Sequence, residues 1–196
     1  RIKPPRQPFT IHDAPHLLAH HPSIWSAIYR RDFLLQNNIW FKEIPGAGWA
    51  DNPFLVETLC QAKAIAYWPK PYYYREETPE KAAALAKRDP LMPFNRWNDM
   101  VDILERLNVT DPAVWTPQIT RGFTYMGIMI EHTGIEGHPE IERAIHKMFE
   151  RMPQELVFAN PRVTPAAKKL YAEYMGIANP KISYCAYAKD LVRGLV

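Results

Sequence analysis

The segment "ADNPFLVETLCQAKAIAYWPKPYYYREE" spans Ala50–Glu77 and contains both the start of a helix and two candidate strands. Apolar residues recur in its first half at three- and four-residue spacings, which predicts a helix that begins near Asp51 and has Pro53 in its first turn. Residues 64–68 and 71–76 are rich in aromatic and aliphatic side chains around a proline turn, and they predict two short strands. The segment therefore places a carboxylate at a helix start and Arg75 at the end of a strand.

The predicted secondary structure before this segment differs from that after residue 78. Before it, residues 23–29 and 39–44 are predicted as extended pieces, with short helices at about 14–21 and 30–38. After it, periodic apolar residues and frequent prolines predict only helices, at 94–108, 112–132, 139–152, 164–175 and 181–194. The predicted fold is α+β and mostly α: a mixed α/β part over 1–77 and a helical bundle region over 78–196.

Composition excludes several classes of function. The chain has 196 residues and a formal net charge of +3, with basic residues scattered along it, so a nucleic-acid surface is not expected. No apolar run reaches the roughly 20 residues that a membrane-spanning helix needs. Cys60 and Cys185 have no closely spaced partner, which favours reduced thiols in a cytoplasmic protein over a metal or redox site.

Three histidines offer an alternative metal site. His12, His16 and His20 recur every four residues and would share a helix face, where they could hold zinc or nickel. Pro15 and Asp13 argue against this arrangement, because the helix is expected to begin after His12. A metal site in this chain is therefore not predicted.

Asp51 and Arg75 each have a local and a functional interpretation. Asp51 can cap the helix, or it can act as a general base that the helix dipole keeps ionised. Arg75 can be a solvated arginine beside Glu76 and Glu77, or it can bind phosphate through its planar guanidinium. When each residue is considered alone, the local structural role is the better explanation for both.

The order of the motifs adds a family resemblance. The pieces "HPSIWSAIYRRDFLLQNNIWFKEI", "GWADNPFLVETL" and "AKAIAYWPKPYYYRE" occur in that order over residues 21–76. This order is similar to the second half of family 2 glycosyltransferases with a GT-A fold, of the bacterial type that builds capsular or cell-wall glycans. The resemblance covers about residues 20–77 and leaves the helices after residue 78 unassigned.

The resemblance implies roles for five residues. Asp51 matches the family's catalytic base, which deprotonates the acceptor hydroxyl in an inverting transfer from a nucleotide-sugar donor to a glycan or lipid-linked acceptor. Trp49 and Asn52 would shape the acceptor site, and Tyr74 and Arg75 match the tyrosine-arginine pair near the donor diphosphate. Ala50 replaces the glutamate that usually precedes the aspartate.

The resemblance also implies that half of the enzyme is elsewhere. The nucleotide-binding units and the Asp-x-Asp motif that holds Mg²⁺ or Mn²⁺ in this family have no counterpart in the sequence. The chain is therefore expected to be a fragment that holds no cofactor and is inactive alone, in a cytoplasmic enzyme that is either free or located at the inner membrane face. Its oligomeric state stays open. The alternative is a non-enzymatic helical interaction module.

Overall fold

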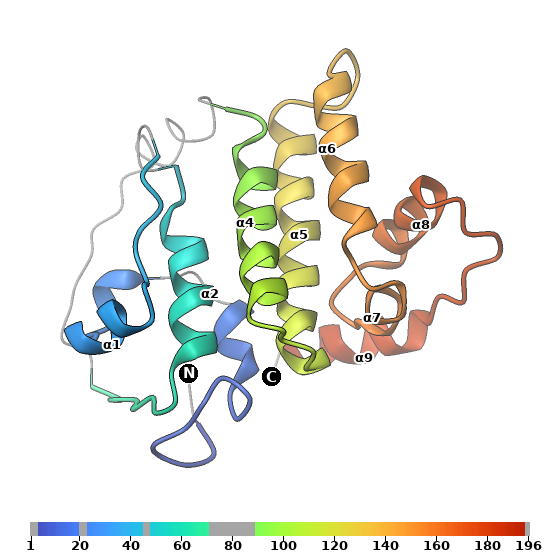
Figure 1. The fold of residues 1–196 in the computed structure, drawn as a ribbon. Coiled ribbons are helices and arrows are strands. Elements are labelled where there is room, and N and C mark those ends of the chain that lie inside the picture. The colour runs from blue at the N-terminus through green and yellow to red at the C-terminus, as the bar shows by residue number, and fades with distance from the viewer. Residues whose placement is uncertain (1–3, 20–22, 45–47, 71–88, 195–196) are drawn as a thin grey trace.

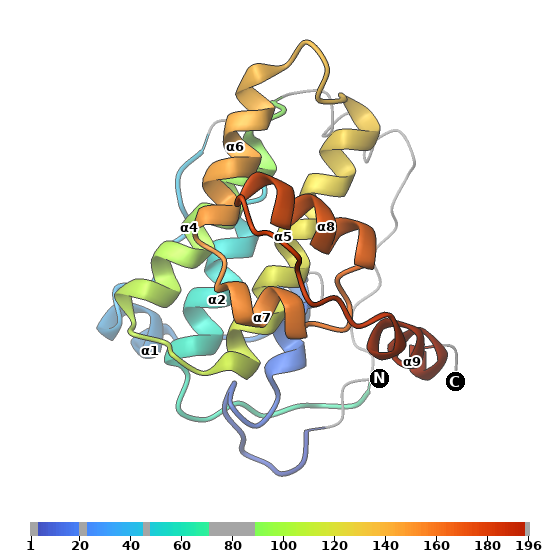
Figure 2. The same cartoon turned by 90° about the vertical axis from the view of Figure 1, so that its right-hand side faces the viewer.

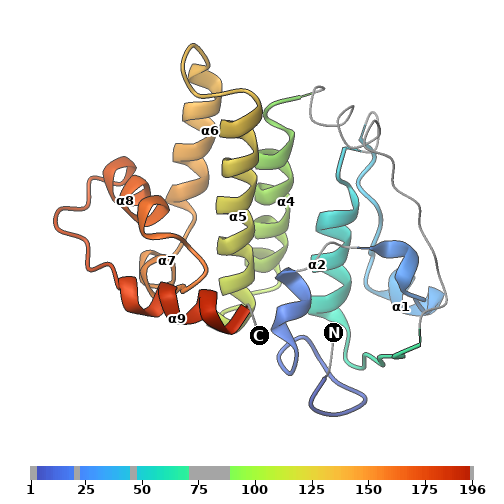
Figure 3. The same ribbon diagram turned by 180° about the vertical axis from the view of Figure 1, so that it is seen from behind.

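Three long helices form the centre of the molecule, a computed structural model that describes residues 4–19, 23–44, 48–70 and 89–194. They are α4 (Met92–Arg106), α5 (Pro112–His132) and α6 (Pro139–Glu150). In Figures 1 and 3 these helices stand side by side, and α4 packs against both α5 and α6. The helices predicted at 94–108, 112–132 and 139–152 are thereby confirmed.

Local capping and turn residues set several helix ends. The Asp111 carboxylate accepts a hydrogen bond of 2.9 Å from the Ala113 amide, and Pro112 follows it in the first turn of α5. Thr164 caps α8 (Pro165–Tyr174) in the same way, through a 3.1 Å bond from the Ala167 amide. After α4 the chain turns at Asn108, whose φ of 52° lies in the left-handed region that asparagine tolerates.

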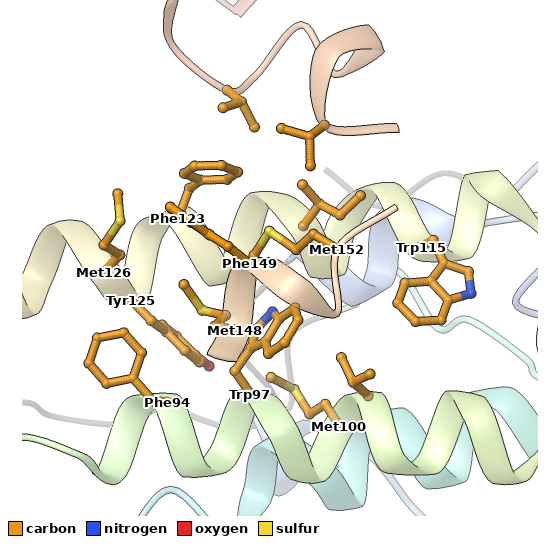
Figure 4. Packing of buried hydrophobic residues seen from close by; sticks show 14 of the residues in the cluster. Phe94, Trp97, Met100, Trp115, Phe123, Tyr125, Met126, Met148, Phe149 and Met152 are labelled. Atoms are coloured by element: carbon orange, nitrogen blue, oxygen red, sulfur yellow. The ribbon is translucent and has the colours of Figure 1, made fainter. Parts of the chain in front are cut away.

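The hydrophobic core lies between α4, α5 and α6. Figure 4 shows large side chains from the three helices meeting there, and Trp97 at the centre is completely buried. The Trp97 indole donates a 2.8 Å hydrogen bond to the Gln118 carbonyl oxygen, which satisfies its buried N–H. Next to it Gly122 lets α5 approach closely, since an added Cβ would lie 2.8 Å from Trp97 Nε1 and would collide with Met152.

The C-terminal helices cover one side of this core. They are α7 (Gln154–Ala159), α8 and α9 (Tyr184–Gly194), and Figure 2 shows α8 in front of α5 with α7 below it. Tyr171 of α8 packs edge-on against Phe149, and its hydroxyl donates a 3.1 Å bond to the Met152 carbonyl oxygen. The helices predicted at 164–175 and 181–194 are confirmed, whereas α7 was not predicted.

The N-terminal part packs against the opposite side. Its elements are η1 (Pro15–Ala19), η2 (Ile24–Ser26), α1 (Arg31–Gln36) and α2 (Asp51–Gln61). The 3₁₀ turn η1 lies on α5 and α2 lies on α4. Ile11, Leu18 and Val56 belong to the same hydrophobic cluster as the long helices. The described residues on the two sides of position 78 therefore share one core.

The mostly helical fold class is confirmed, but the expected strands are not present in the described ranges. The strand predicted over 23–29 is wrong, because Ser23 adopts a φ of 40° and a 3₁₀ turn follows. Residues 39–44 form no strand, and the strand predicted over 64–68 is reduced to an isolated bridge between Phe9 and Ile65. An extended segment forms a strand only when another extended segment pairs with it. Within the described residues, the Phe9–Ile65 bridge is the only such pairing. Residues 71–88, including the second predicted strand, lie outside the described residues.

The length and composition of each helix decide whether it could cross a membrane. Among the helices within the described residues, none is both long and apolar enough to cross a membrane. Even α5, with 21 residues, carries buried polar side chains such as Gln118 and Arg121.

Candidate functional site

Asp51 is the first residue of α2 and is half-buried. The position before the helix belongs to Ala50, so the expected side-chain cap by Asp51 is wrong: no side-chain cap hydrogen bond is formed at this end of α2. The carboxylate lies at the amino end of α2, the positive end of the helix dipole. The carboxylate therefore lies at a helix terminus without the local capping role that would otherwise explain it.

Asn52 organises the surroundings of Asp51 from inside the protein. Its side chain is 7% exposed. Its Oδ1 atom accepts 3.1 Å hydrogen bonds from both Arg121 Nη1 and the Tyr125 hydroxyl. Its Nδ2 atom donates 3.3 Å hydrogen bonds to the Trp49 carbonyl oxygen and to Asp51 Oδ1. Both acceptor positions and both donor hydrogens of the amide are thus in use.

Trp49 is held next to Asp51 by the backbone as well. Its φ of 57° places it in the left-handed region, which is uncommon for a bulky residue. Its carbonyl oxygen accepts a 3.1 Å hydrogen bond from the Asn52 amide, and its ring centroid lies 5.0 Å from that of Tyr125. The turn at Trp49 therefore fixes the indole in one place beside the start of α2.

Arg121 and Tyr125 come from α5 and were missed in the sequence. Both are 7% exposed, and Figure 4 shows Tyr125 projecting from α5 toward α4. Burial raises the pKa of Tyr125 to about 12, and the Asp51 charge adds to this rise while the Arg121 charge opposes it. One signal could have found them: Gln118, Arg121 and Tyr125 are polar groups at helical spacing on a helix whose other buried residues are largely apolar.

The arrangement brings together three of the five predicted site residues. Trp49, Asp51 and Asn52 form one cluster with Arg121 and Tyr125. Tyr74 and Arg75 lie outside the described residues. Chemically, the cluster presents one half-buried carboxylate beside a fixed aromatic ring, and a buried amide network holds both in position.

The histidines do not assemble into a metal site in the described part of the chain. His12 Nδ1 lies 2.6 Å from Asp111 Oδ2, so this residue is paired with the N-cap of α5. His20 lies outside the described residues. Within those ranges, no three histidine, cysteine or acidic side chains are placed to hold a metal ion.

Comparisons with known proteins add no assignment to this geometry. Searches against models of protein families, against curated proteins and against solved structures each find no match to the chain.

Proposed function

We propose that this chain is the acceptor-side part of an inverting family 2 glycosyltransferase, with Asp51 as the catalytic base. The acceptor hydroxyl gives its proton to the Asp51 carboxylate while its oxygen attacks the anomeric carbon of the donor sugar. The bond from that carbon to the nucleoside diphosphate breaks, and the diphosphate departs with the bonding electrons. The product carries the inverted anomeric configuration.

One observation carries the proposal: Asp51 is ordered at a helix start without serving as the cap of that helix. The Asn52 amide bonds to Asp51 Oδ1 and to the carbonyl oxygen of Trp49, so the base and the aromatic ring keep a fixed relation. A flat indole face beside a base suits the apolar face of an acceptor sugar. Fixed geometry of this kind is what general-base catalysis requires.

The donor half of the reaction is assigned to residues beyond this cluster. The diphosphate and the Mg²⁺ or Mn²⁺ that supplies Lewis-acid stabilisation of it need ligands that the described residues do not offer, as no suitable group of metal ligands occurs among them. In this proposal the donor half of the site is supplied by chain outside the described residues.

The alternative, a self-contained interaction module, is less well supported. Such a module should bury its aromatic side chains, yet Trp40 is 64% and Trp68 is 67% exposed. It also gives no reason for an asparagine whose amide nitrogen donates hydrogen bonds to both Trp49 and Asp51. The two hypotheses differ in what they expect from a substitution at Asp51.

The test uses the native full-length protein, whose intact mass is first measured after recovery from source cells with an antibody against this chain. Release of nucleoside diphosphate from UDP-glucose, UDP-galactose and UDP-N-acetylglucosamine is then followed with and without a glycan acceptor. Asp51→Asn should lower kcat by about 10²–10⁴-fold, the usual contribution of a general base, and leave donor affinity unchanged. Asp32→Asn is the matched control, because Asp32 lies exposed in the first turn of α1.

Two outcomes would contradict the proposal. If Asp51→Asn retains the rate shown by Asp32→Asn, Asp51 is not the base. If the 196-residue chain alone transfers sugar or hydrolyses a donor in the presence of Mg²⁺ or Mn²⁺, the assignment of the donor half to a longer chain fails.

A further inference from the structure

A groove of about 330 Å³ lies between the segment 38–42 and the helices α2 and α4. Its volume is at the lower end of the range of small-molecule sites, roughly 300–1,000 Å³. The groove is separate from the cluster around Asn52, although Pro53 and Phe54 in its wall follow Asp51 on the same helix. None of the roles considered for Asp51 uses it.

The aromatic wall of the groove is fixed in place. Trp40 Nε1 donates a 2.8 Å hydrogen bond to Asn38 Oδ1, which restrains an indole that is 64% exposed. Phe41 stacks on Phe54 with their ring centroids 3.9 Å apart and their planes 11° from parallel. A large exposed ring that is held by its own polar atom is ready to bind without losing much side-chain entropy.

The polar wall consists of three carboxylates whose charges are already balanced. Lys42 Nζ lies 2.5 Å from Asp99 Oδ1, and Arg106 pairs with Glu57. Arg151 Nη2 lies 2.7 Å from Asp102 Oδ1, and the Asp102 side chain is 64% exposed. Asp102 is the open member of the three, and its oxygens keep lone pairs that can accept hydrogen bonds from a neutral donor.

These features select the chemistry of the ligand. A metal cation is disfavoured, since Glu57, Asp99 and Asp102 do not converge into a group that could hold a metal ion. An anion is disfavoured because the neighbouring basic side chains of Lys42, Arg106 and Arg151 are already engaged by carboxylates. A neutral polyhydroxyl ring matches both walls, because its C–H face packs on Trp40 and its hydroxyl groups donate to carboxylate oxygens.

We infer that the groove formed by Trp40, Phe41, Phe54 and the carboxylates of Glu57, Asp99 and Asp102 binds one unit of a neutral saccharide. Trp40 is the stacking platform, and Asp102 is the principal hydrogen-bond acceptor because it is the most exposed of the three carboxylates. This binding needs no catalytic step, so it holds whether or not Asp51 is a general base.

Saturation-transfer NMR tests the inference on the 196-residue chain, with maltose, lactose and N,N′-diacetylchitobiose as neutral probes and galacturonic acid as the anionic one. Each probe is used at about 10 mM, so that binding with a millimolar Kd is detected. At least one neutral disaccharide should receive saturation at its ring C–H protons. Trp40→Ala should weaken that binding by about tenfold or more, and Asp102→Asn should weaken it less, since the amide keeps one acceptor oxygen.

The matched control is Trp68→Ala, because Trp68 is 67% exposed and lies outside the groove. It should leave binding unchanged. The inference is overturned if no neutral probe binds, if Trp40→Ala binds as well as Trp68→Ala, or if galacturonic acid binds better than every neutral disaccharide.

Discussion

Asn52 uses its full hydrogen-bonding capacity inside the protein, so it is expected to be sensitive to substitution. Asn52→Ala would leave Arg121 Nη1 and the Tyr125 hydroxyl without their shared acceptor in a site where each of these residues is 7% exposed. Losing a buried hydrogen-bond acceptor of this kind costs about 1–3 kcal/mol. Urea unfolding should show a loss of stability in that range.

The control for this measurement is Asn95→Ala, which removes an exposed asparagine from α4. Exposed substitutions usually stay within about 0.5 kcal/mol. Equal stability of the two variants would mean that the amide network around Asn52 contributes little.

The raised pKa of Tyr125 makes the stability of the folded protein depend on pH under alkaline conditions. Its pKa rises from 10.0 to about 12 on folding, so above pH 10 the unfolded state loses the phenolic proton while the folded state keeps it. The folded state then binds more protons than the unfolded state, and stability falls as pH rises. Between about pH 10 and 11 this single group should lower the free energy of unfolding by about 1 kcal/mol.

Tyr125→Phe isolates that contribution. The variant has no phenol to titrate at this position, so its stability should fall less steeply than that of the wild type over the same pH interval. Urea unfolding at several alkaline pH values gives both slopes. Parallel slopes would show that the pKa of Tyr125 is the same in the folded and unfolded states.

At the scale of elements, the crossing of α4 and α5 depends on Gly122. A Cβ at this position would lie 2.8 Å from Trp97 Nε1 and collide with Met152 Cε. Gly122→Ala should therefore destabilise the protein by about 1–3 kcal/mol, the usual cost of overpacking a core. Thermal unfolding followed by circular dichroism measures the effect.

Gly127, on the same helix, is the matched control for Gly122. A Cβ at Gly127 meets nothing within 4 Å, so Gly127→Ala gains helix propensity of about 0.5–1 kcal/mol without a clash. The two variants should shift the melting temperature in opposite directions. A stabilising Gly122→Ala would contradict the close packing of α5 on α4.

Local signals explain which elements were predictable from sequence. Asp111–Pro112 and Thr164–Pro165 combine a capping side chain with a proline suited to the first turn, and α5 and α8 begin there. The strand at 23–29 failed because β-branched and aromatic residues favour extended backbone only where a pairing partner exists. The short α7 was missed because six residues carry too little periodicity to identify a helix.

The residues of the candidate site also differ in whether the sequence could predict them. Trp49, Asp51 and Asn52 are consecutive or nearly so, and a local motif was enough to identify them. Arg121 and Tyr125 lie 69 and 73 residues from Asn52 in the chain, and only tertiary packing brings them to it. Polar residues that serve a distant partner give no local signal beyond their place on an otherwise apolar helix.

At the scale of the whole molecule, the described N-terminal residues and the helical layer depend on each other for burial. Leu18 of η1 is completely buried in the cluster that includes Trp97 and Ile119, and Val56 of α2 joins it from the α4 side. Without these contributions, α4 and α5 would expose the apolar faces that now meet η1 and α2. One shared core favours one cooperative unfolding transition.

Leu18→Ala tests this cooperativity. Removing a fully buried leucine side chain should cost about 2–5 kcal/mol. If the core is a single unit, native-state hydrogen exchange should show the same loss of protection for the slowest amides of α2 and α6, although Leu18 belongs to neither helix. Ile28→Ala is the control, because Ile28 is 93% exposed and its truncation should leave both helices unchanged. A loss of protection confined to η1 and α2 would instead divide the molecule into two units, with the Asn52 network as the polar contact that joins them.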